Sequence, residues 1–200
     1  MLAALLAPPI ALAAGWIRMP ASELLGKPVI DMQGDRLGRV QDLVVDVRNS
    51  RVSYAIVGFN GWGTLGEELF PVPLKSLAPE PGGSRVTLQV APRTLRDGAS
   101  IDAQSEPRLP ADAPLKQHVR ASELVGRRVS DRTGTHAGEI EEAVIDMNSG
   151  LVLFLLFDYD EAWGLDQPAL RMAPQAFSFP ADGGPAVVNV ARERLEDPGR

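Results

Sequence analysis

The feature that most constrains the fold of this chain is an internal duplication with a period of 100 residues. The run Ala21-Ser22-Glu23-Leu24 recurs without a gap as Ala121-Ser122-Glu123-Leu124. Other residues that recur 100 positions later include Gly26, Val29, Asp31, Gly34, Gly38, Val44, Asp46, Val52, Val90, Ala91 and Leu95. A fixed period indicates one structural unit used twice. We therefore divide the chain into repeat 1 (19–98), a linker (99–118) containing Pro107, Pro110 and Pro114, and repeat 2 (119–198).

The pattern within each repeat predicts short strands. Ser22 and Ser122 are expected to be N-caps of a single helical turn, which Gly26 and Gly126 end. In repeat 1, strand-like segments then follow over residues 28–31, 37–47, 51–59, 68–72 and 85–90, with an irregularity near Asp42. Closing such a sheet into a barrel removes exposed edges and buries one face. The expected fold class is all-β, with two small tandem barrels joined by a Pro-containing linker.

Two residue types recur at the predicted turns of both repeats. The glycines are expected to adopt positive φ or to allow a close approach of backbone; they are Gly34, Gly38, Gly134 and Gly138. Asp46 and Asp146 lie beside tight turns, where aspartate commonly accepts backbone N–H groups. Their recurrence in both repeats favours this structural role over acid–base chemistry, because a catalytic site need exist only once.

The order of these motifs resembles the PRC-barrel family. The residues that carry the resemblance are Ser22-Glu23-Leu24-x-Gly26, Val29-x-Asp31-x-x-Gly34-x-x-x-Gly38-x-Val40-x-Asp42 and Asp46, and repeat 2 repeats them with Ile140 and Glu142 substituting. The resemblance implies a small all-β barrel, related to those of the photosynthetic reaction centre H subunit and of a ribosome maturation factor. It also implies a binding or assembly module with no common catalytic residues.

Composition argues against several kinds of chemistry. The chain has no cysteine, which excludes disulfides, thiolate catalysis and cysteine-bound zinc. Its net charge is −6 and no cluster of Lys and Arg occurs, which argues against nucleic acid as a partner. The two histidines, His118 and His136, are expected in the linker and in a turn. No nucleophile elbow, P-loop or dinucleotide-binding pattern is found, so we expect no catalytic residue and no cofactor.

Repeat 2 is the more acidic of the two. Residues 121–200 contain seven basic and fourteen acidic side chains, against nine and nine in residues 21–100. An acidic face of this kind would suit a basic protein partner. The densest acidic cluster holds Asp158, Asp160 and Glu161, the candidate ligands if a hard cation binds. The spacing lacks the glycine and distal glutamate of a calcium hand, so a solvated acidic hairpin is the expected role.

The third strand of repeat 2 is apolar throughout. Residues 151–157 read Leu-Val-Leu-Phe-Leu-Leu-Phe, whereas the counterpart in repeat 1 carries Arg51, Ser53 and Ala55. We expect Leu151, Leu153, Leu155 and Phe157 to lie on an outer face that is covered by repeat 1 or by a second chain in a homodimer. Trp62 and Trp163 fall in corresponding loops and are further interface candidates, with packing over the barrel mouth as the alternative.

The first seventeen residues carry no charge, and Ala11 and Ala13 fit the small-x-small pattern of a signal peptidase site. Residues 1–14 are therefore expected to be a signal peptide, with an apolar anchor or an uncleaved tail as alternatives and membrane contact only if the segment is uncleaved. The resulting hypothesis is a non-catalytic binding or scaffold protein, periplasmic or exported, that mediates protein assembly in the bacterial envelope. The alternatives are a membrane-tethered accessory subunit of an electron-transfer complex and a metal-dependent sensor or enzyme.

Overall fold

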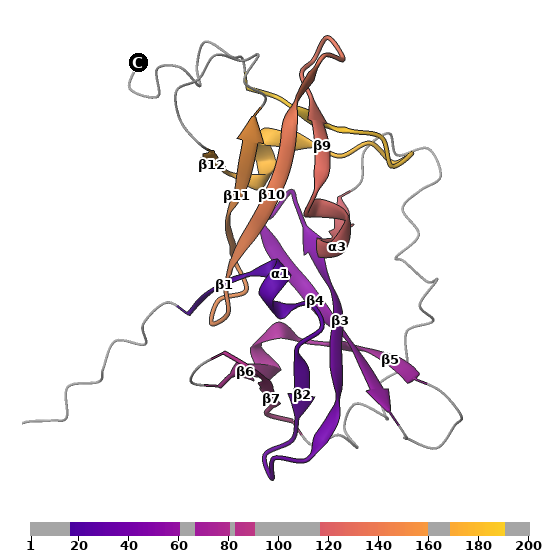
Figure 1. The fold of residues 1–200 in the computed structure, drawn as a ribbon, viewed down its shortest axis with the longest axis vertical. Coiled ribbons are helices and arrows are strands. Elements are labelled where there is room, and N and C mark those ends of the chain that lie inside the picture. Colours follow the sequence, from indigo (N-terminus) through magenta and orange to yellow (C-terminus); the bar gives the residue numbers. More distant parts are fainter. Residues whose placement is uncertain (1–16, 61–66, 81–82, 91–116, 160–168, 191–200) are drawn as a thin grey trace, which may run out of the picture.

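The computed structural model describes residues 17–60, 67–80, 83–90, 117–159 and 169–190. They form two seven-stranded sheets that stack along the long axis of the molecule (Figure 1). The elements of the first half are β1 (Arg18–Pro20), α1 (Ala21–Leu24), β2 (Pro28–Ile30), β3 (Arg36–Asp46), β4 (Arg51–Asn60), β5 (Glu67–Val72), η1 (Leu74–Ser76), β6 (Leu77–Pro79) and β7 (Val86–Leu88). Those of the second half are β8 (His118–Arg120), α3 (Ala121–Leu124), β9 (Arg127–Ser130), β10 (His136–Asp146), β11 (Val152–Tyr159), β12 (Leu170–Met172), η3 (Pro174–Ala176), β13 (Phe177–Ser178) and β14 (Ala186–Val188). The all-β prediction with two tandem barrels is confirmed.

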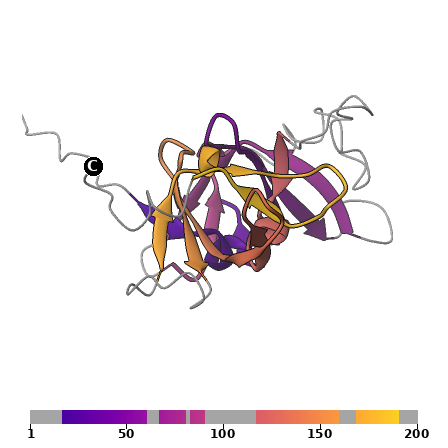
Figure 2. The ribbon, with the colours of Figure 1, turned by 90° about the horizontal axis from the view of Figure 1, so that it is seen from above.

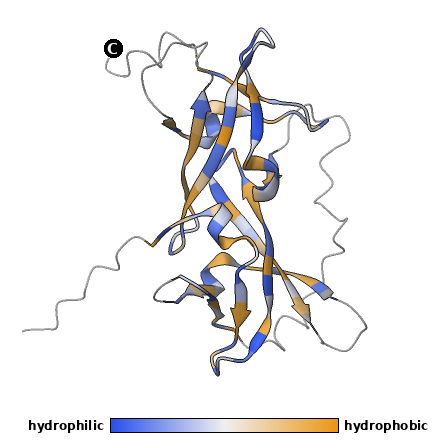
Figure 3. Ribbon diagram, in the orientation of Figure 1, coloured by the Kyte–Doolittle hydropathy of each residue, from blue (hydrophilic) through white to orange (hydrophobic). Residues whose placement is uncertain are grey.

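The two sheets share one topology. The strand order is β5-β4-β3-β2-β7-β6 in one and β12-β11-β10-β9-β14-β13 in the other. Neighbours are antiparallel except for β2 with β7 and β9 with β14, which run parallel. The bands of hydrophobic and hydrophilic residues along β3 and β10 follow the pleat of half-buried strands (Figure 3). Within the described residues, no helix is long and apolar enough to cross a membrane.

β-bulges interrupt the long hairpin of each sheet at equivalent places. The register shifts between Val40 and Asp42, which confirms the irregularity predicted near Asp42, and again between Val44 and Val45. Repeat 2 has both shifts at the same positions plus 100. In each bulge one strand contributes an extra residue, so the inward and outward faces of that strand exchange beyond it.

The first strand of each repeat belongs to the sheet of the other repeat. β1 pairs with β10, placing Met19 opposite Ile145, and β8 pairs with β3, placing Val119 opposite Val45. The helical turns α1 and α3 follow their strands and lie at the junction between the two sheets (Figure 1). Each barrel is therefore completed by a segment from the other repeat. The duplicated sequence unit and the structural unit are not the same stretch of chain.

The exchanged segments are anchored by apolar burial. The side chains of Met19, Leu24, Val119 and Leu124 are at most 6% exposed and belong to one continuous core that runs through both sheets. Burying a side chain of this size stabilises a fold by about 1.5–3 kcal/mol. We infer that each exchanged segment contributes to the stability of the barrel that receives it.

The serine of each helical turn is not an N-cap, contrary to the sequence prediction. The N-caps are Pro20 and Arg120, and neither makes a side-chain capping bond. The Ser122 hydroxyl and N–H instead donate to the Asp42 carboxylate at 2.5 and 3.1 Å, and Ser22 donates in the same way to Glu142. The carboxylate beside the bulge of each repeat thus binds the serine of the other repeat's helical turn. The local sequence does not indicate this partner.

Candidate binding groove at the junction of the repeats

The turn residues singled out in the sequence shape the barrels. Gly34 and Gly134 lie in turns with φ of +91° and +88°, a region that L side chains rarely adopt. Gly38 packs against the neighbouring strand so closely that a Cβ would collide with the carbonyl oxygen of Gly58, and Gly138 meets Asp158 in the same way. Gly34 and Gly134 thus serve tight turns, and Gly38 and Gly138 serve the close packing of strands.

Asp46 and Asp146 organise the hairpin turns that face the opposite repeat. Asp46 Oδ1 accepts the N–H groups of Arg48 and Asn49, both at 3.0 Å, and its Oδ2 accepts the Asn49 side-chain amide at 2.7 Å. Asp146 accepts equivalent bonds from Asn148 and Ser149. Both carboxylates thus accept N–H groups of their own turns, the role that the sequence predicts for them.

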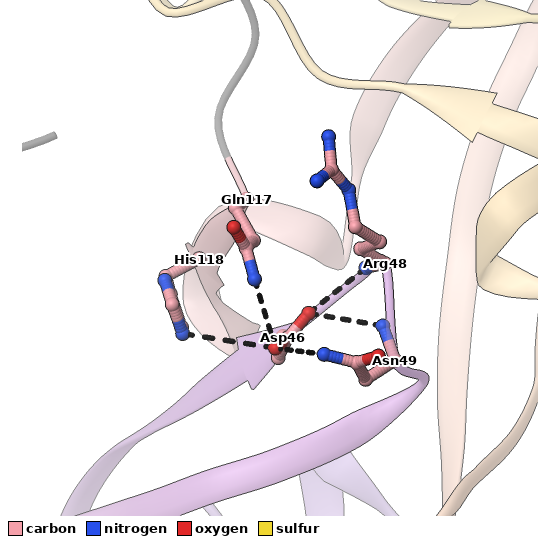
Figure 4. A network of polar contacts seen from close by, with 5 residues as sticks. All are labelled: Asp46, Arg48, Asn49, Gln117 and His118. Atoms are coloured by element: carbon pink, nitrogen blue, oxygen red, sulfur yellow. Dashed lines mark hydrogen bonds and ion pairs between the residues drawn. The ribbon is translucent and has the colours of Figure 1, made fainter. Parts of the chain in front are cut away.

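Asp46 also binds the exchanged strand. Gln117 Nε2 donates to its Oδ2 at 3.2 Å, and His118 Nε2 lies 3.9 Å from the same oxygen (Figure 4). Burial acts to raise the pKa of Asp46, but the bonds from Asn49 and Gln117 and the charge of His118 outweigh it and hold the pKa below its ordinary value. His118 therefore lies in β8, not in a linker, and forms part of the contact between repeats.

The two hairpin turns also touch each other directly. Val52 N–H donates to the Gly150 carbonyl and Val152 N–H donates to the Ser50 carbonyl, both at 2.8 Å. Arg51 and Leu151 form an isolated antiparallel bridge between these bonds. Leu151 thus lies at the contact between the repeats.

Residues further along β11 do not lie on an outer face, contrary to the sequence interpretation. Leu153 is the extra residue of a bulge, which reverses the facing of the residues that follow. Leu155 and Phe157 are consequently fully buried, and the Phe157 ring packs on Phe177 with centroids 5.7 Å apart. These two residues belong to the core of repeat 2, while Leu153 stays partly exposed.

The remaining sequence candidates lie largely outside the described residues. Asp160, Glu161, Trp62 and Trp163 are in the ranges 61–66 and 160–168, of which nothing is described. Asp158 is exposed on β11, opposite Glu139. Within the described part of the chain, no three His, Cys, Asp or Glu side chains gather closely enough to hold a metal ion.

A groove runs along the junction and draws its lining from both repeats. Its volume is about 200 Å³, and its lining residues are Val47, Arg48, Gln117, Gln175, Phe177, Ser178, Phe179 and Asn189. The first two belong to the β3–β4 turn, Gln117 directly precedes β8, and the others come from repeat 2. The groove therefore exists only when both repeats are assembled, and sequence reasoning missed it because its residues are contiguous in neither repeat.

The backbone of the groove is fixed by bonds between the repeats. Val47 N–H donates to the Gln117 carbonyl at 3.0 Å, and Gln175 Nε2 donates to the Arg48 carbonyl at 3.3 Å. Phe177 and Phe179 are buried below the surface and form an apolar floor. The result is a preformed hollow with an apolar base and a rim of amides, a hydroxyl and a guanidinium, the usual make-up of a binding site.

One protein family matches this chain. The family model of the PRC-barrel domain matches residues 17–92 and again residues 116–167, which together are more than half of the chain. The first match spans most of repeat 1 and the second spans the first part of repeat 2, and each includes the strand that pairs with the opposite sheet. No curated protein matches the chain.

Proposed function

Because the chain belongs to the PRC-barrel family and carries two copies of its module, we propose that it is a scaffold protein that binds another protein through the junction of its repeats. PRC-barrel domains are small binding or scaffold-type modules and are generally non-catalytic. We further propose that the chain is exported and acts in the bacterial envelope. This location rests on the sequence of residues 1–14.

The observation that carries the proposal is the groove shared by the two repeats. Strand exchange fixes the repeats relative to each other, and the groove is lined by residues of both. A binding surface held by rigid elements loses little conformational freedom when a partner binds. The tandem arrangement thus supplies a surface that one barrel alone would lack.

The test is site-specific photo-crosslinking of the full chain in living cells. A photoreactive amino acid replaces Gln175, an exposed groove residue, and in a matched control replaces Met32, which is 66% exposed in the β2–β3 turn. The proposal expects a discrete protein adduct from position 175 that is absent from position 32. Adducts of the same kind from both positions, or from neither, would count against the groove as the binding surface.

The location is tested in the same cells by fractionation. The proposal expects the chain in the periplasmic or extracellular fraction, with its N-terminus near residue 14 or 15 when read by mass spectrometry. Recovery of all the protein in the cytosol would contradict export, while leaving the binding proposal to be decided by the crosslinks.

A further inference from the structure

We propose that the junction groove binds an acidic segment of the protein partner, with an Asp or Glu carboxylate seated between Arg48 and the amide groups of the rim. The proposal deepens the proposed function and rests on it, because it names the chemistry that the groove recognises. It concerns the groove alone: the chain as a whole is acidic, with a net charge of −6.

In the described part of the chain, the lining of the groove carries a guanidinium and no carboxylate, although the protein is acidic. Arg48 is the one ionisable residue of its lining. Its backbone N–H is bonded to Asp46, but its guanidinium points away from that carboxylate (Figure 4) and has no hydrogen-bond or ion-pair partner among the described residues. A second guanidinium lies close by, because Arg132 Nη2 donates to the carbonyl of the lining residue Asn189 at 2.6 Å.

The nearby carboxylates keep their negative charge, but among the described residues neither Asp46 nor Asp131 pairs with the Arg48 guanidinium. Asp46 accepts bonds from its own turn and from Gln117. Asp131, next in sequence to Arg132, accepts the N–H groups of Thr133 and Thr135 at 2.8 and 2.9 Å. No described residue occupies the guanidinium of Arg48, which leaves it available to an incoming anion, and an Arg–carboxylate contact has the geometry for two parallel hydrogen bonds.

The amides of the rim fit the main chain of a peptide. Gln117, Gln175 and Asn189 each use one amide N–H within the protein, donating to Asp46, to the Arg48 carbonyl and to Ser178 Oγ. A primary amide has two N–H donors and an acceptor oxygen, so each retains one donor and its oxygen as far as bonds to the described residues go. Such groups can pair with both the carbonyls and the N–H groups of an extended peptide.

The size of the groove favours side chains over a cofactor. Its volume of about 200 Å³ lies below the roughly 300–1,000 Å³ typical of sites for drug-sized molecules. One or two side chains of a bound segment would occupy it, with their aliphatic stems against Phe177 and Phe179.

The equivalent positions at the other junction have a different chemistry. The backbone there is the same, since Met147 N–H donates to the Ile17 carbonyl at 3.0 Å as Val47 does to Gln117. However, Ile17 takes the place of Gln117 and Asn148 that of Arg48, and Ile17 is 41% exposed. Lys75 and Gln89 stand at the positions of Gln175 and Asn189, so the other junction also holds a cation and amides. It lacks an arginine in the hairpin turn, which is the feature that sets the groove apart.

The experiment is an NMR titration of the ¹⁵N-labelled full chain. The probe is the end-capped peptide acetyl-Gly-Glu-Ser-Glu-Gly-amide, and its control has Gln in place of both Glu residues. The side-chain NH₂ signals of Gln117, Gln175 and Asn189 report directly on the groove. The proposal expects saturable shifts of these signals with the Glu peptide and none with the Gln peptide.

Two variants complete the test. Arg48→Gln is expected to weaken the Glu peptide about tenfold, the usual effect of losing a charged hydrogen bond. Arg36→Gln, at the far end of β3, should bind as the wild type does, and both spectra should otherwise superimpose on that of the wild type. Unchanged affinity in Arg48→Gln, equal binding of the Gln peptide, or no saturable shift would overturn the proposal. If the photo-crosslink at position 175 persists in Arg48→Gln, the binding function stands and the acidic-segment inference fails.

Discussion

The bond between Asp42 and Ser122 offers a quantitative test of strand exchange, because it joins residues of opposite repeats. Asp42 is 5% exposed and accepts the Ser122 hydroxyl and N–H as well as the N–H of Leu43 at 2.8 Å. Arg120 Nη1 lies 4.0 Å from the same carboxylate. Replacing Asp42 by Ala removes a buried charged acceptor from three donors, so the loss of unfolding free energy should be about 2–4 kcal/mol.

A double-mutant cycle isolates the contact between repeats. Ser122→Ala alone should cost about 1–2 kcal/mol, and the cycle of Asp42→Ala with Ser122→Ala should show a coupling energy of about 1–2 kcal/mol. The assay is urea unfolding followed by far-ultraviolet circular dichroism. The matched control is Asp31→Ala with Ser122→Ala, since the N–H groups that Asp31 accepts among the described residues all lie within its own turn. That pair should be additive within about 0.5 kcal/mol. Additivity of the Asp42 pair as well would refute the exchange.

Three further outcomes are expected from urea unfolding. Gly38→Ala should lower the free energy of unfolding by more than about 3 kcal/mol, because its Cβ would strike the Gly58 carbonyl. A loss below about 0.5 kcal/mol would show that the two strands are further apart. Leu155→Ala, at a fully buried position, should lower the free energy of unfolding by about 2–5 kcal/mol, and Leu153→Ala by only about 1 kcal/mol. The reverse order would indicate that Leu155 lies on the outer face. The pKa of Asp46 is lowered in the folded state, so its contribution is present above the ordinary pKa of 3.8 and is lost as the pH falls through the folded value. Asp46→Asn should flatten this acid loss of stability, and an unchanged pH profile would contradict the assignment.

The sequence predicts local features of the fold well. The duplication, the strands, the irregularity at Asp42 and the glycine turns all depend on residues close together in the chain, and local conformation decides them. The inner face of β11 could not be read from alternation because Leu153 is the extra residue of a bulge, and one extra residue reverses the facing of Leu155 and Phe157.

Strand exchange could not be predicted for a different reason. The helical turns Ala21–Leu24 and Ala121–Leu124 are identical, and the strands before them, Arg18–Pro20 and His118–Arg120, are only three residues long and each place one apolar side chain inward, so local criteria do not assign either segment to one sheet. The choice is made by how the whole chain connects, which composition and periodicity do not encode. The junction groove depends on that choice, and its residues could therefore be recognised as a site only once the two repeats were placed together.

The most direct test of the central claim, that each barrel is completed by the other repeat, is a set of long-range NOEs in the uniformly labelled full chain. Because Met19 differs from Val119 and Val45 from Ile145, the two possible pairings give distinguishable signals. The exchanged arrangement predicts NOEs between Met19 and Ile145 and between Val119 and Val45. NOEs between Met19 and Val45 and between Val119 and Ile145 would instead show that each repeat folds on its own, and would contradict the account.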